Sequence, residues 1–293
     1  MTSLKHRSYP LVHRLISFLR DKDVRGIRRL SVVLPRILLP KVESVGEHIL
    51  KTIHGFSLKI NPSIDKGVEL SLFETGTYEK GLLYSLDDFL KPGDCFVDVG
   101  ANIGLMSIYA SKLVGESGEV IAYEAHPETF NWLTFNIELN KISNIKANNF
   151  ALGSEPSQLF IYDNWQVNRG GASLIVKDEQ SKSYPVEVKR LDDCLPRNLK
   201  PKVIKVDVEG FELEVLKGAT QTITDFKPIL VIELSSLRTN HHENTDLIDF
   251  IEKLHCYDFF KLKGTKERVS KLIPIITKDE FPEHDNIICI PRV

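Results

Sequence analysis

Short apolar runs alternate with longer stretches of helical periodicity from residue 94 onward. CFVDV, residues 95–99, is a run of the kind found in a parallel strand that is buried on both faces. IGLMSIYASKLVG follows it, with apolar side chains at helical spacing. EVIAYE, PETFNWLTFNIELN and NIKANNFAL then continue the succession of strand, helix and strand. This βαβαβ order predicts an α/β fold with a mainly parallel sheet.

The alternation is interrupted between residues 158 and 189. Three β-prone pieces, QLFIYD, ASLIVK and YPVEVK, surround the turn NRGG there, and we expect an antiparallel insertion. The alternation resumes with KVIKVDV, a helix near FELEVLKG, the strand ILVIEL, a helix across DLIDFIEKLHCY, and final strands at DFFKLK and NIICIP. Residues 94–293 are thus predicted to form a doubly wound sheet of about seven strands, mostly parallel with an antiparallel edge. In such sheets a ligand binds beyond the carboxyl ends of the strands, where the strand order reverses.

Two segments precede this domain and form a small N-terminal extension. Residues 46–93 contain short apolar pieces with turn residues, and predict a strand-and-loop lead-in. Residues 1–45 are interpreted as a basic amphipathic arm, because residues 1–41 hold ten Lys or Arg against two Asp. Charges interrupt its apolar residues too often for a signal peptide or a membrane-spanning helix. The arm is expected either to make a peripheral contact with an anionic membrane or to pack on the acidic body of the protein.

The overall charge narrows the class of partner. The formal net charge is −2, so the chain beyond the arm is acidic, which opposes binding to a nucleic acid backbone. The four cysteines have no CxxC spacing and are interpreted as reduced thiols of a cytoplasmic protein without a zinc site. These features do not indicate an oligomeric state.

The stretch DVGANIG joins the first strand of the domain to its first helix. Gly100 and Gly104 enclose Asn102 there, and such a turn directs backbone N–H groups at the anionic part of a ligand. A dinucleotide site normally has the spacing GxGxxG, whose middle glycine is missing here. Asp98, before the turn, would repel phosphates and attract an ammonium or sulfonium group. Glu124 ends the next strand, 20 residues beyond Gly104, where a carboxylate can bind the hydroxyls of a ribose.

Several of these pieces resemble one known family. FVDVGANIG, YEAHP, IKVDVEGFELEVLKGA, VIEL and the upstream GTYEKG are similar to motifs of the FkbM-type methyltransferases, over roughly residues 70–235. The resemblance implies a Rossmann-like methyltransferase fold and S-adenosylmethionine as cofactor. It also implies O-methylation of a hydroxyl on a saccharide, glycolipid precursor or secondary metabolite, so that the partner is a small-molecule or glycan acceptor. Cofactor contacts are implied for Glu74 and Tyr78 in a flap, for Ala125 beside Glu124, and for Asn149 near the adenine.

Acidic residues at two later strand ends are the candidates for catalysis. An alcohol needs a general base within hydrogen-bond reach of its oxygen when it accepts a methyl group. Lys205, Asp207 and Glu209 share one face if the strand alternates regularly through KVDVEG. Asp207 or Glu209 is then the base or the anchor of the acceptor hydroxyl. Lys205 could lower the carboxylate pKa or stabilise the negative charge that develops on the acceptor oxygen. Glu233 ends ILVIEL and is expected to face the site, because a buried carboxylate needs a partner or a ligand.

Other interpretations stay open. The acids at positions 207, 209 and 233 could hold a divalent metal, which acidic residues alone do not establish. The acidic cluster of KVDVEGFE, with Asp207, Glu209 and Glu212, could instead only cap the following helix. His126 could contact adenine or cap its helix. The insertion, with Trp165, Asn168 and Arg169, could recognise the acceptor or complete the sheet edge as a hairpin. Two functions compete with methyl transfer, namely an NAD-dependent oxidoreductase or epimerase and a non-catalytic nucleoside-binding scaffold.

Overall fold

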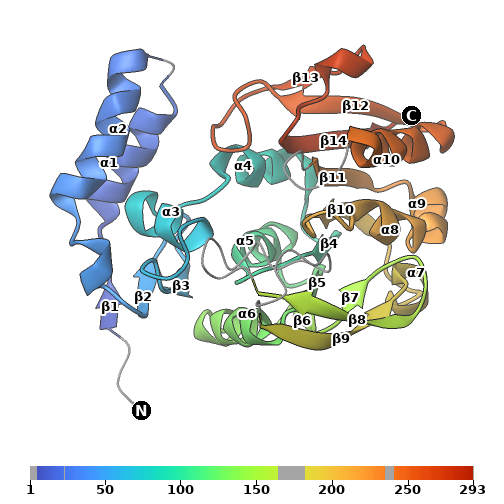
Figure 1. Cartoon of the computed structure of the whole chain (residues 1–293), viewed down its shortest axis with the longest axis horizontal. Coiled ribbons are helices and arrows are strands. Elements are labelled where there is room, and N and C mark those ends of the chain that lie inside the picture. Colours follow the sequence, from blue (N-terminus) through green and yellow to red (C-terminus); the bar gives the residue numbers. More distant parts are fainter. Residues whose placement is uncertain (1–4, 23, 164–181, 235–240, 293) are drawn as a thin grey trace.

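The computed structural model describes residues 5–22, 24–163, 182–234 and 241–292. Its main body has three layers, with an eight-stranded sheet between two layers of helices (Figure 1). The parallel strands are β4 (Cys95–Val99), β5 (Glu119–Tyr123), β6 (Ile145–Asn148), β10 (Pro201–Val206) and β11 (Ile229–Leu234). They lie side by side in the order β11-β10-β4-β5-β6. The strand order therefore reverses between β4 and β10.

Three antiparallel strands extend the sheet beyond β11. From β11 to the edge they are β14 (Asp285–Pro291), β12 (Tyr257–Leu262) and β13 (Leu272–Pro274), and a single turn of 3-10 helix, η3 (Lys278–Glu280), lies between β13 and β14. The predicted mostly parallel sheet with an antiparallel edge is confirmed. It has eight strands because β13 adds a strand that the sequence did not predict, being too short to show an alternating pattern.

Helices cover both faces of the sheet because its strands bury side chains on both sides. In β4, Phe96 packs in the apolar cluster under α4 (Lys80–Phe89) and α5 (Leu105–Val114), whereas its neighbour Val97 packs in the cluster on the opposite face. α6 (Pro127–Leu139) belongs to the same layer as α5 and completes the predicted βαβαβ succession. The opposite layer contains α7 (Leu191–Cys194), α8 (Glu212–Lys217), α9 (Thr220–Phe226) and α10 (His241–Lys253).

The insertion forms a small sheet of its own. β8 (Ser157–Tyr162) and β9 (Ser183–Lys189) pair antiparallel, as predicted, and β7 (Ala151–Leu152) pairs with β9. This sheet is separate from the main one, so the alternative that the hairpin completes the main sheet edge is wrong. The piece ASLIVK and the residues Trp165, Asn168 and Arg169 lie outside the described residues.

Residues 46–93 contain two helices where only strands and loops were expected. β2 (His48–Lys51) and β3 (Ser57–Ile60) are followed by α3 (Val68–Thr75) and α4. In α4 the buried side chains recur at helical spacing, and they belong to Leu82, Leu83, Leu86 and Phe89. The strand-and-loop interpretation is therefore wrong for this part, because the turn residues of FETGTYEKG lie between two helices and not between strands.

The N-terminal arm forms a helical hairpin beside the main body (Figure 1). Its elements are β1 (Lys5–Arg7), α1 (Pro10–Arg20), α2 (Arg25–Leu38) and the 3-10 turn η1 (Val42–Ser44). Arg20 pairs with Glu74 of α3 at 3.2 Å, and Asp21 pairs with Lys80 of α4 at 2.5 Å. One side of the arm thus packs on the body of the protein. None of the helices in the described ranges combines the length and apolarity needed to cross a bilayer.

Candidate active site

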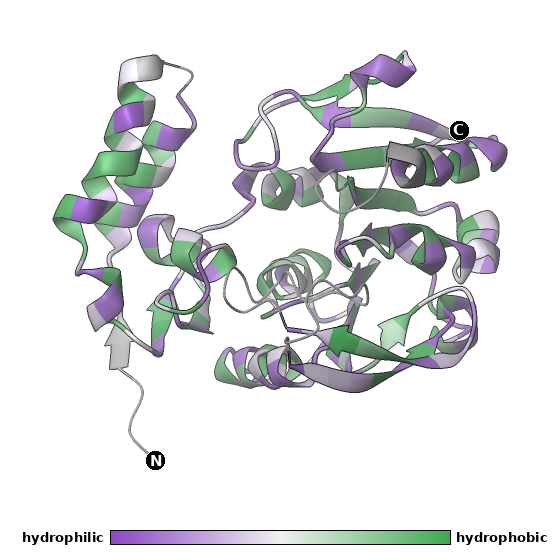
Figure 2. Ribbon diagram, in the orientation of Figure 1, coloured by the Kyte–Doolittle hydropathy of each residue, from purple (hydrophilic) through white to green (hydrophobic). Residues whose placement is uncertain are grey.

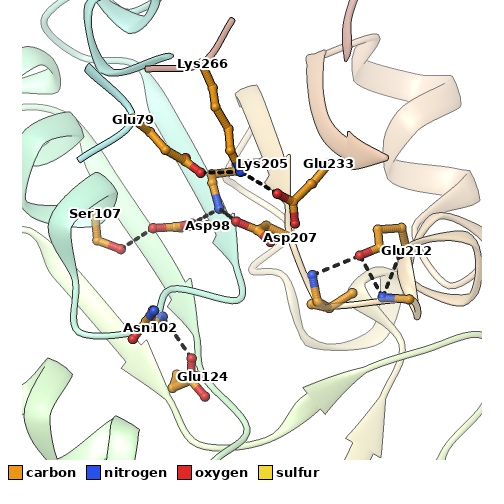
Figure 3. A network of polar contacts seen from close by, with 12 residues as sticks. Glu79, Asp98, Asn102, Ser107, Glu124, Lys205, Asp207, Glu212, Glu233 and Lys266 are labelled. Atoms are coloured by element: carbon orange, nitrogen blue, oxygen red, sulfur yellow. Dashed lines mark hydrogen bonds and ion pairs between the residues drawn. The ribbon is translucent and has the colours of Figure 1, made fainter. Parts of the chain in front are cut away.

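A pocket lies at the carboxyl ends of β4, β5, β10 and β11, at the point where the strand order reverses. This is the position expected for a ligand in a doubly wound sheet. Figure 3 shows polar side chains that converge there from strands, turns and a distant loop. Six carboxyl groups are among the described residues that line the pocket, and they belong to Glu79, Asp98, Glu124, Asp207, Glu209 and Glu233.

The glycine turn after β4 uses its backbone N–H groups within the protein. Gly100 donates to the carbonyl oxygen of Tyr123 at 3.0 Å. Asn102 donates to Oε2 of Glu124 at 2.8 Å, and Gly104 donates within the turn at 3.0 Å. The expectation that these N–H groups point at an anionic ligand is therefore wrong for these three residues. A diphosphate would have to compete with existing hydrogen bonds.

Both glycines of the turn are required for close packing. Their φ values are 83° at Gly100 and 95° at Gly104, in the left-handed region that favours glycine. A Cβ atom at Gly100 would lie only 1.8 Å from the carbonyl oxygen of Asp207. At Gly104 it would lie 2.7 Å from Cδ1 of Leu133 in α6. Gly100 therefore allows the ends of β4 and β10 to approach each other at the pocket.

Asp98 is fully buried beneath the turn. It points toward α5, because it alternates with Phe96 along β4, and Ser107 of α5 donates to its Oδ2 at 2.5 Å. Nζ of Lys205 lies 3.9 Å from Oδ1, beyond hydrogen-bond distance. Burial raises the pKa of Asp98, and the nearby ammonium of Lys205 opposes this. Oδ1 is buried yet accepts no hydrogen bond from a described residue, so it has room for a donor from a ligand.

Glu124 follows β5 and is held by backbone groups on both sides. Its Oε2 accepts the N–H of Asn102, and its Oε1 accepts the N–H of His126 at 2.9 Å. Burial raises the pKa of Glu124 to about 7 in spite of these two hydrogen bonds. Ala125 lines the pocket beside it, whereas Asn149 is not among the lining residues. The side chain of Asn149 instead donates to the carbonyl oxygens of Glu124 and Ala125, at 2.9 and 3.1 Å, and so fixes this strand end.

His126 caps the N-terminus of α6. Its Nδ1 accepts the N–H of Thr129 at 3.3 Å, and its Nε2 pairs with Asp163 at 2.5 Å. The side chain is fully buried and is not among the residues that line the pocket. Of the two interpretations of His126, the helix cap is therefore confirmed.

Lys205 joins two of the pocket acids. It lies opposite Asp98 in the pairing of β10 with β4, and its Nζ is 2.8 Å from Oδ2 of Asp207. Burial is the largest single influence and would raise the pKa of Asp207, but the ammonium of Lys205, a hydrogen bond with Glu233 and the charge of Lys266 together lower it. Asp207 is therefore ionised at neutral pH, and Lys205 acts on its pKa as the sequence predicted.

Glu209 does not continue the strand. β10 ends at Val206, and Glu209 adopts a left-handed φ of 56° in the turn before α8. The prediction that it shares a strand face with Lys205 and Asp207 is therefore wrong, because the chain turns sharply here and Gly210 has a φ of 103°. The turn nevertheless brings Glu209 to the pocket wall.

The environment of Glu209 differs from that of Asp207. Burial raises the pKa of Glu209 to about 7, and the charges of Asp207 and Glu212 act in the same direction. Glu212 holds the turn itself, because it accepts the N–H groups of Val208 and Gly210 at 3.2 and 3.1 Å. The helix-capping alternative therefore applies to Glu212, which is buried at the start of α8.

Glu233 ends β11 and lines the pocket, as expected from the sequence. Burial and the charge of Asp207 raise its pKa, whereas Lys266 opposes them. Of this neighbouring pair of acids, Asp207 carries the negative charge and Glu233 retains its proton at neutral pH.

Lys266 is a site residue that the sequence analysis missed. It lies in the loop between β12 and β13, and its Nζ is 2.5 Å from Glu233 and 2.7 Å from Glu79 (Figure 3). The N–H of Gly81, in the first turn of α4, donates to the carbonyl oxygen of Lys266 at 2.8 Å and anchors this loop. No motif marks the loop, and it lies outside the part of the chain on which the resemblance rests.

The segment GTYEKG before α4 contributes to the pocket only in part. Tyr78 and Glu79 line it, as the resemblance implied for Tyr78. Glu74 is not among the lining residues and instead pairs with Arg20 of α1. The structure therefore brings Tyr78 to the predicted site and leaves Glu74 at the contact with the N-terminal hairpin.

Some of the pocket acids contact ammonium groups. Asp207 contacts Lys205, and Glu233 contacts Lys266. In the part of the chain that the structure describes, no group of three or more His, Cys, Asp or Glu side chains is arranged to hold a metal ion. All four cysteines are free thiols.

Comparison with curated proteins finds related methyltransferases. Methyltransferase 1 of Beauveria bassiana is 31% identical over 165 residues, which cover 49% of this chain and 66% of that protein. The hexuronic acid methyltransferase AglP of Haloferax volcanii is 29% identical over 162 residues, which cover 52% of this chain and 61% of that protein. The matched region thus spans just under two thirds of the length of these relatives.

A solved structure and a family model also match. The methyltransferase FkbM from Methylobacillus flagellatus KT aligns with 95% of this chain and 58% of its own, with 17% identity and a TM-score of 0.45. The family model described as the methyltransferase FkbM domain matches residues 98–259, which is more than half of the chain and includes every pocket acid except Glu79. The resemblance seen in the sequence is thereby confirmed, and the chain belongs to the FkbM methyltransferase family.

Proposed function

We propose that this protein is an S-adenosylmethionine-dependent O-methyltransferase that acts on a hydroxyl group of a saccharide, glycolipid precursor or secondary metabolite. The observation that carries the proposal is the acidic lining of the pocket. Six carboxyl groups of described residues line it, of which Glu233 retains its proton, against the ammonium groups of Lys205 and Lys266. Such a lining favours a cationic ligand and disfavours linked phosphates. Bound S-adenosylmethionine would supply a methyl group on a sulfonium centre, together with an ammonium group.

Two strand-end acids suit the two ends of this cofactor. Oδ1 of Asp98 is buried without a donor and fits the ammonium group of an amino-acid tail. Glu124 accepts one backbone N–H at each oxygen, and each oxygen keeps a lone pair for a ribose hydroxyl. Phe150 and Leu152 line the same pocket with apolar surface, which suits an adenine ring.

We assign the general base to Glu209. Burial raises its pKa to about 7, near the value at which a base works best at neutral pH. Asp207, whose pKa is lowered by Lys205, is a weaker base and is assigned to anchoring the acceptor hydroxyl. The left-handed backbone of Glu209 is a strained conformation of the kind that persists at functional sites.

The chain's own residues then have distinct roles in methyl transfer. Asp207 orients the hydroxyl, and a carboxylate oxygen of Glu209 takes its proton as the hydroxyl oxygen attacks the methyl carbon in line. Bound S-adenosylmethionine would supply that methyl group with loss of its carbon–sulfur bond, in a displacement that disperses charge. Lys266 holds Glu79 and Glu233 in place beside the reacting groups.

The saccharide class is supported by the polar lining of the pocket and by one relative, a hexuronic acid methyltransferase. The test is to incubate the purified protein with S-adenosylmethionine and a panel of uronic acid glycosides. A control panel contains the same glycosides with every hydroxyl group already methylated. We expect S-adenosylhomocysteine and a new methyl ether only with the free hydroxyls, measured by mass spectrometry and NMR. Methyl esters, methylamines or no turnover with any hydroxyl acceptor would contradict the proposal.

A further inference from the structure

The N-terminal hairpin presents apolar side chains to solvent. Fourteen large hydrophobic residues are exposed among those the structure describes, and nine of them lie between residues 11 and 38. Apolar groups so concentrated on one small element mark an interaction surface, whereas single exposed ones are ordinary. Figure 2 shows hydrophobic segments on both helices of the hairpin, interleaved with hydrophilic ones.

In α1 an apolar stripe faces away from the protein. Leu11, Leu15 and Phe18 recur at helical spacing on the outer side and are 82, 46 and 55% exposed. The inner side buries His13 and Ser17 together with Ile16, and His13 shares a hydrogen bond with the carbonyl oxygen of Phe73 at 2.9 Å. Packing on the body therefore leaves the outer stripe exposed to solvent, apart from the ammonium of Lys22, which lies 4.3 Å from the ring centre of Phe18.

In α2 an apolar stripe runs beside a row of arginines. Leu30, Val33 and Ile37 are 51, 46 and 69% exposed. Arg29 and Arg36 are also exposed and lie seven residues apart, so they follow the same direction along the helix. We call the two stripes, with the exposed Arg14, Arg29 and Arg36 beside them, the hairpin face. An apolar stripe flanked by basic residues is typical of helices that lie in a membrane surface.

The charge of the hairpin face identifies the chemistry of its partner. Arg14, Arg29 and Arg36 form no ion pair with any described residue, whereas Arg20 and Asp21 hold the hairpin to the body. A second copy of the chain, docked about a two-fold axis, would bring the same arginines of the two copies together. An anionic lipid surface satisfies both the arginines and the apolar stripes.

We propose that the hairpin face docks this protein on an anionic membrane surface without crossing it. The apolar stripes of α1 and α2 enter the boundary between headgroups and acyl chains, and the arginines contact the lipid phosphates. Residues 1–41 have ten basic and two acidic side chains within a chain of net charge −2, so the rest of the protein is acidic and is directed away from the lipid.

The test is sedimentation with vesicles, using the full chain. Vesicles of phosphatidylcholine alone are compared with vesicles that contain about 30% phosphatidylglycerol, at low ionic strength. We expect binding to the anionic vesicles only. The double variant Phe18→Ser/Ile37→Ser should bind at least ~10-fold more weakly. The double variant Arg29→Gln/Arg36→Gln should bind anionic vesicles roughly 30-fold more weakly, and its binding should depend less on salt, because Arg14 alone of the three face arginines remains.

Matched controls replace exposed residues elsewhere. Ile276→Ser removes an apolar side chain that is 77% exposed, and Lys200→Gln/Lys202→Gln removes two exposed charges. Both controls should bind anionic vesicles as the unmodified protein does. The proposal is overturned if the unmodified protein stays in solution with anionic vesicles, or if the hairpin variants and the controls bind equally. It is also overturned if sedimentation velocity finds a dimer that Phe18→Ser/Ile37→Ser dissociates, because a second copy would then cover the hairpin face.

Discussion

Acids of one chemical type take different protonation states in this pocket because their neighbours differ. Asp207 lies beside the ammonium of Lys205 and stays ionised, whereas Glu209 is buried next to other acids and has a pKa of about 7. The sequence placed both acids at the same strand end and left open which of them is the base. Asp207 and Glu209 have different environments because β10 ends at Val206 and the chain then turns at Glu209 and Gly210.

Replacement of Glu209 tests its role as the base. Glu209→Gln should lower kcat by about 10²–10⁴-fold while the affinity for S-adenosylmethionine is unchanged. In the unmodified enzyme kcat/KM should fall as the pH drops below about 7, because the raised pKa of Glu209 leaves the carboxylate protonated there. The variant should lose this limb of the pH profile.

The matched control for that experiment is Glu214→Gln, in the first turn of α8, where the side chain pairs with Lys217 at 2.6 Å. It should keep the activity and the pH profile of the unmodified enzyme. If Glu209→Gln kept the acidic limb, the base would have to be another group.

Glu124 is predicted to bind the cofactor and not the acceptor. Glu124→Ala should weaken S-adenosylmethionine binding by roughly 10–100-fold, because hydrogen bonds from ribose hydroxyls to a charged group are lost. Glu119→Ala, at the other end of β5, removes a carboxylate that pairs with Lys146 on the surface and should leave binding unchanged. Calorimetric titration of both variants measures the difference. Equal weakening of cofactor and acceptor binding would count against this assignment.

At the scale of elements, the sequence predicted the strands and helices whose pattern is locally complete. β4, α5, β5 and α6 each show their own period, and the antiparallel edge follows from the last strands. α3 and α4 were missed because turn residues lie between them. The role of the loop between β12 and β13 could not be predicted, because Lys266 reaches the site only through contacts with residues distant in the sequence.

The docking of that loop on α4 depends on Gly81. A Cβ atom there would lie 2.2 Å from the carbonyl oxygen of Arg268, so Gly81→Ala should destabilise the fold by about 1–3 kcal/mol and displace Lys266 from the pocket. Gly26→Ala, in α2, is the control, because a Cβ atom at that position meets nothing within 4 Å. It should raise the free energy of unfolding by roughly 0.5 kcal/mol. Urea denaturation of both variants measures the two effects, and a neutral Gly81→Ala would contradict the close contact.

At the scale of the whole molecule, charge is divided between two surfaces. The basic N-terminal hairpin stands on one side of the body (Figure 1). The acidic pocket lies at the carboxyl ends of β4, β5, β10 and β11. The sequence indicated the basic arm and the acidic remainder. The sequence did not indicate that the N–H groups of the turn after β4 donate hydrogen bonds within the protein. Those hydrogen bonds depend on Tyr123 and Glu124, at the end of the neighbouring strand.

The central claim is that the pocket at the reversal point was shaped for a cationic nucleoside and not for a dinucleotide. Isothermal titration calorimetry of the purified chain with S-adenosylmethionine and with NAD tests it most directly. The account predicts saturable binding of S-adenosylmethionine at one site per chain and no measurable heat with NAD, because the acids repel its phosphates and the turn offers them few N–H donors. Tight binding of NAD together with no binding of S-adenosylmethionine would contradict it.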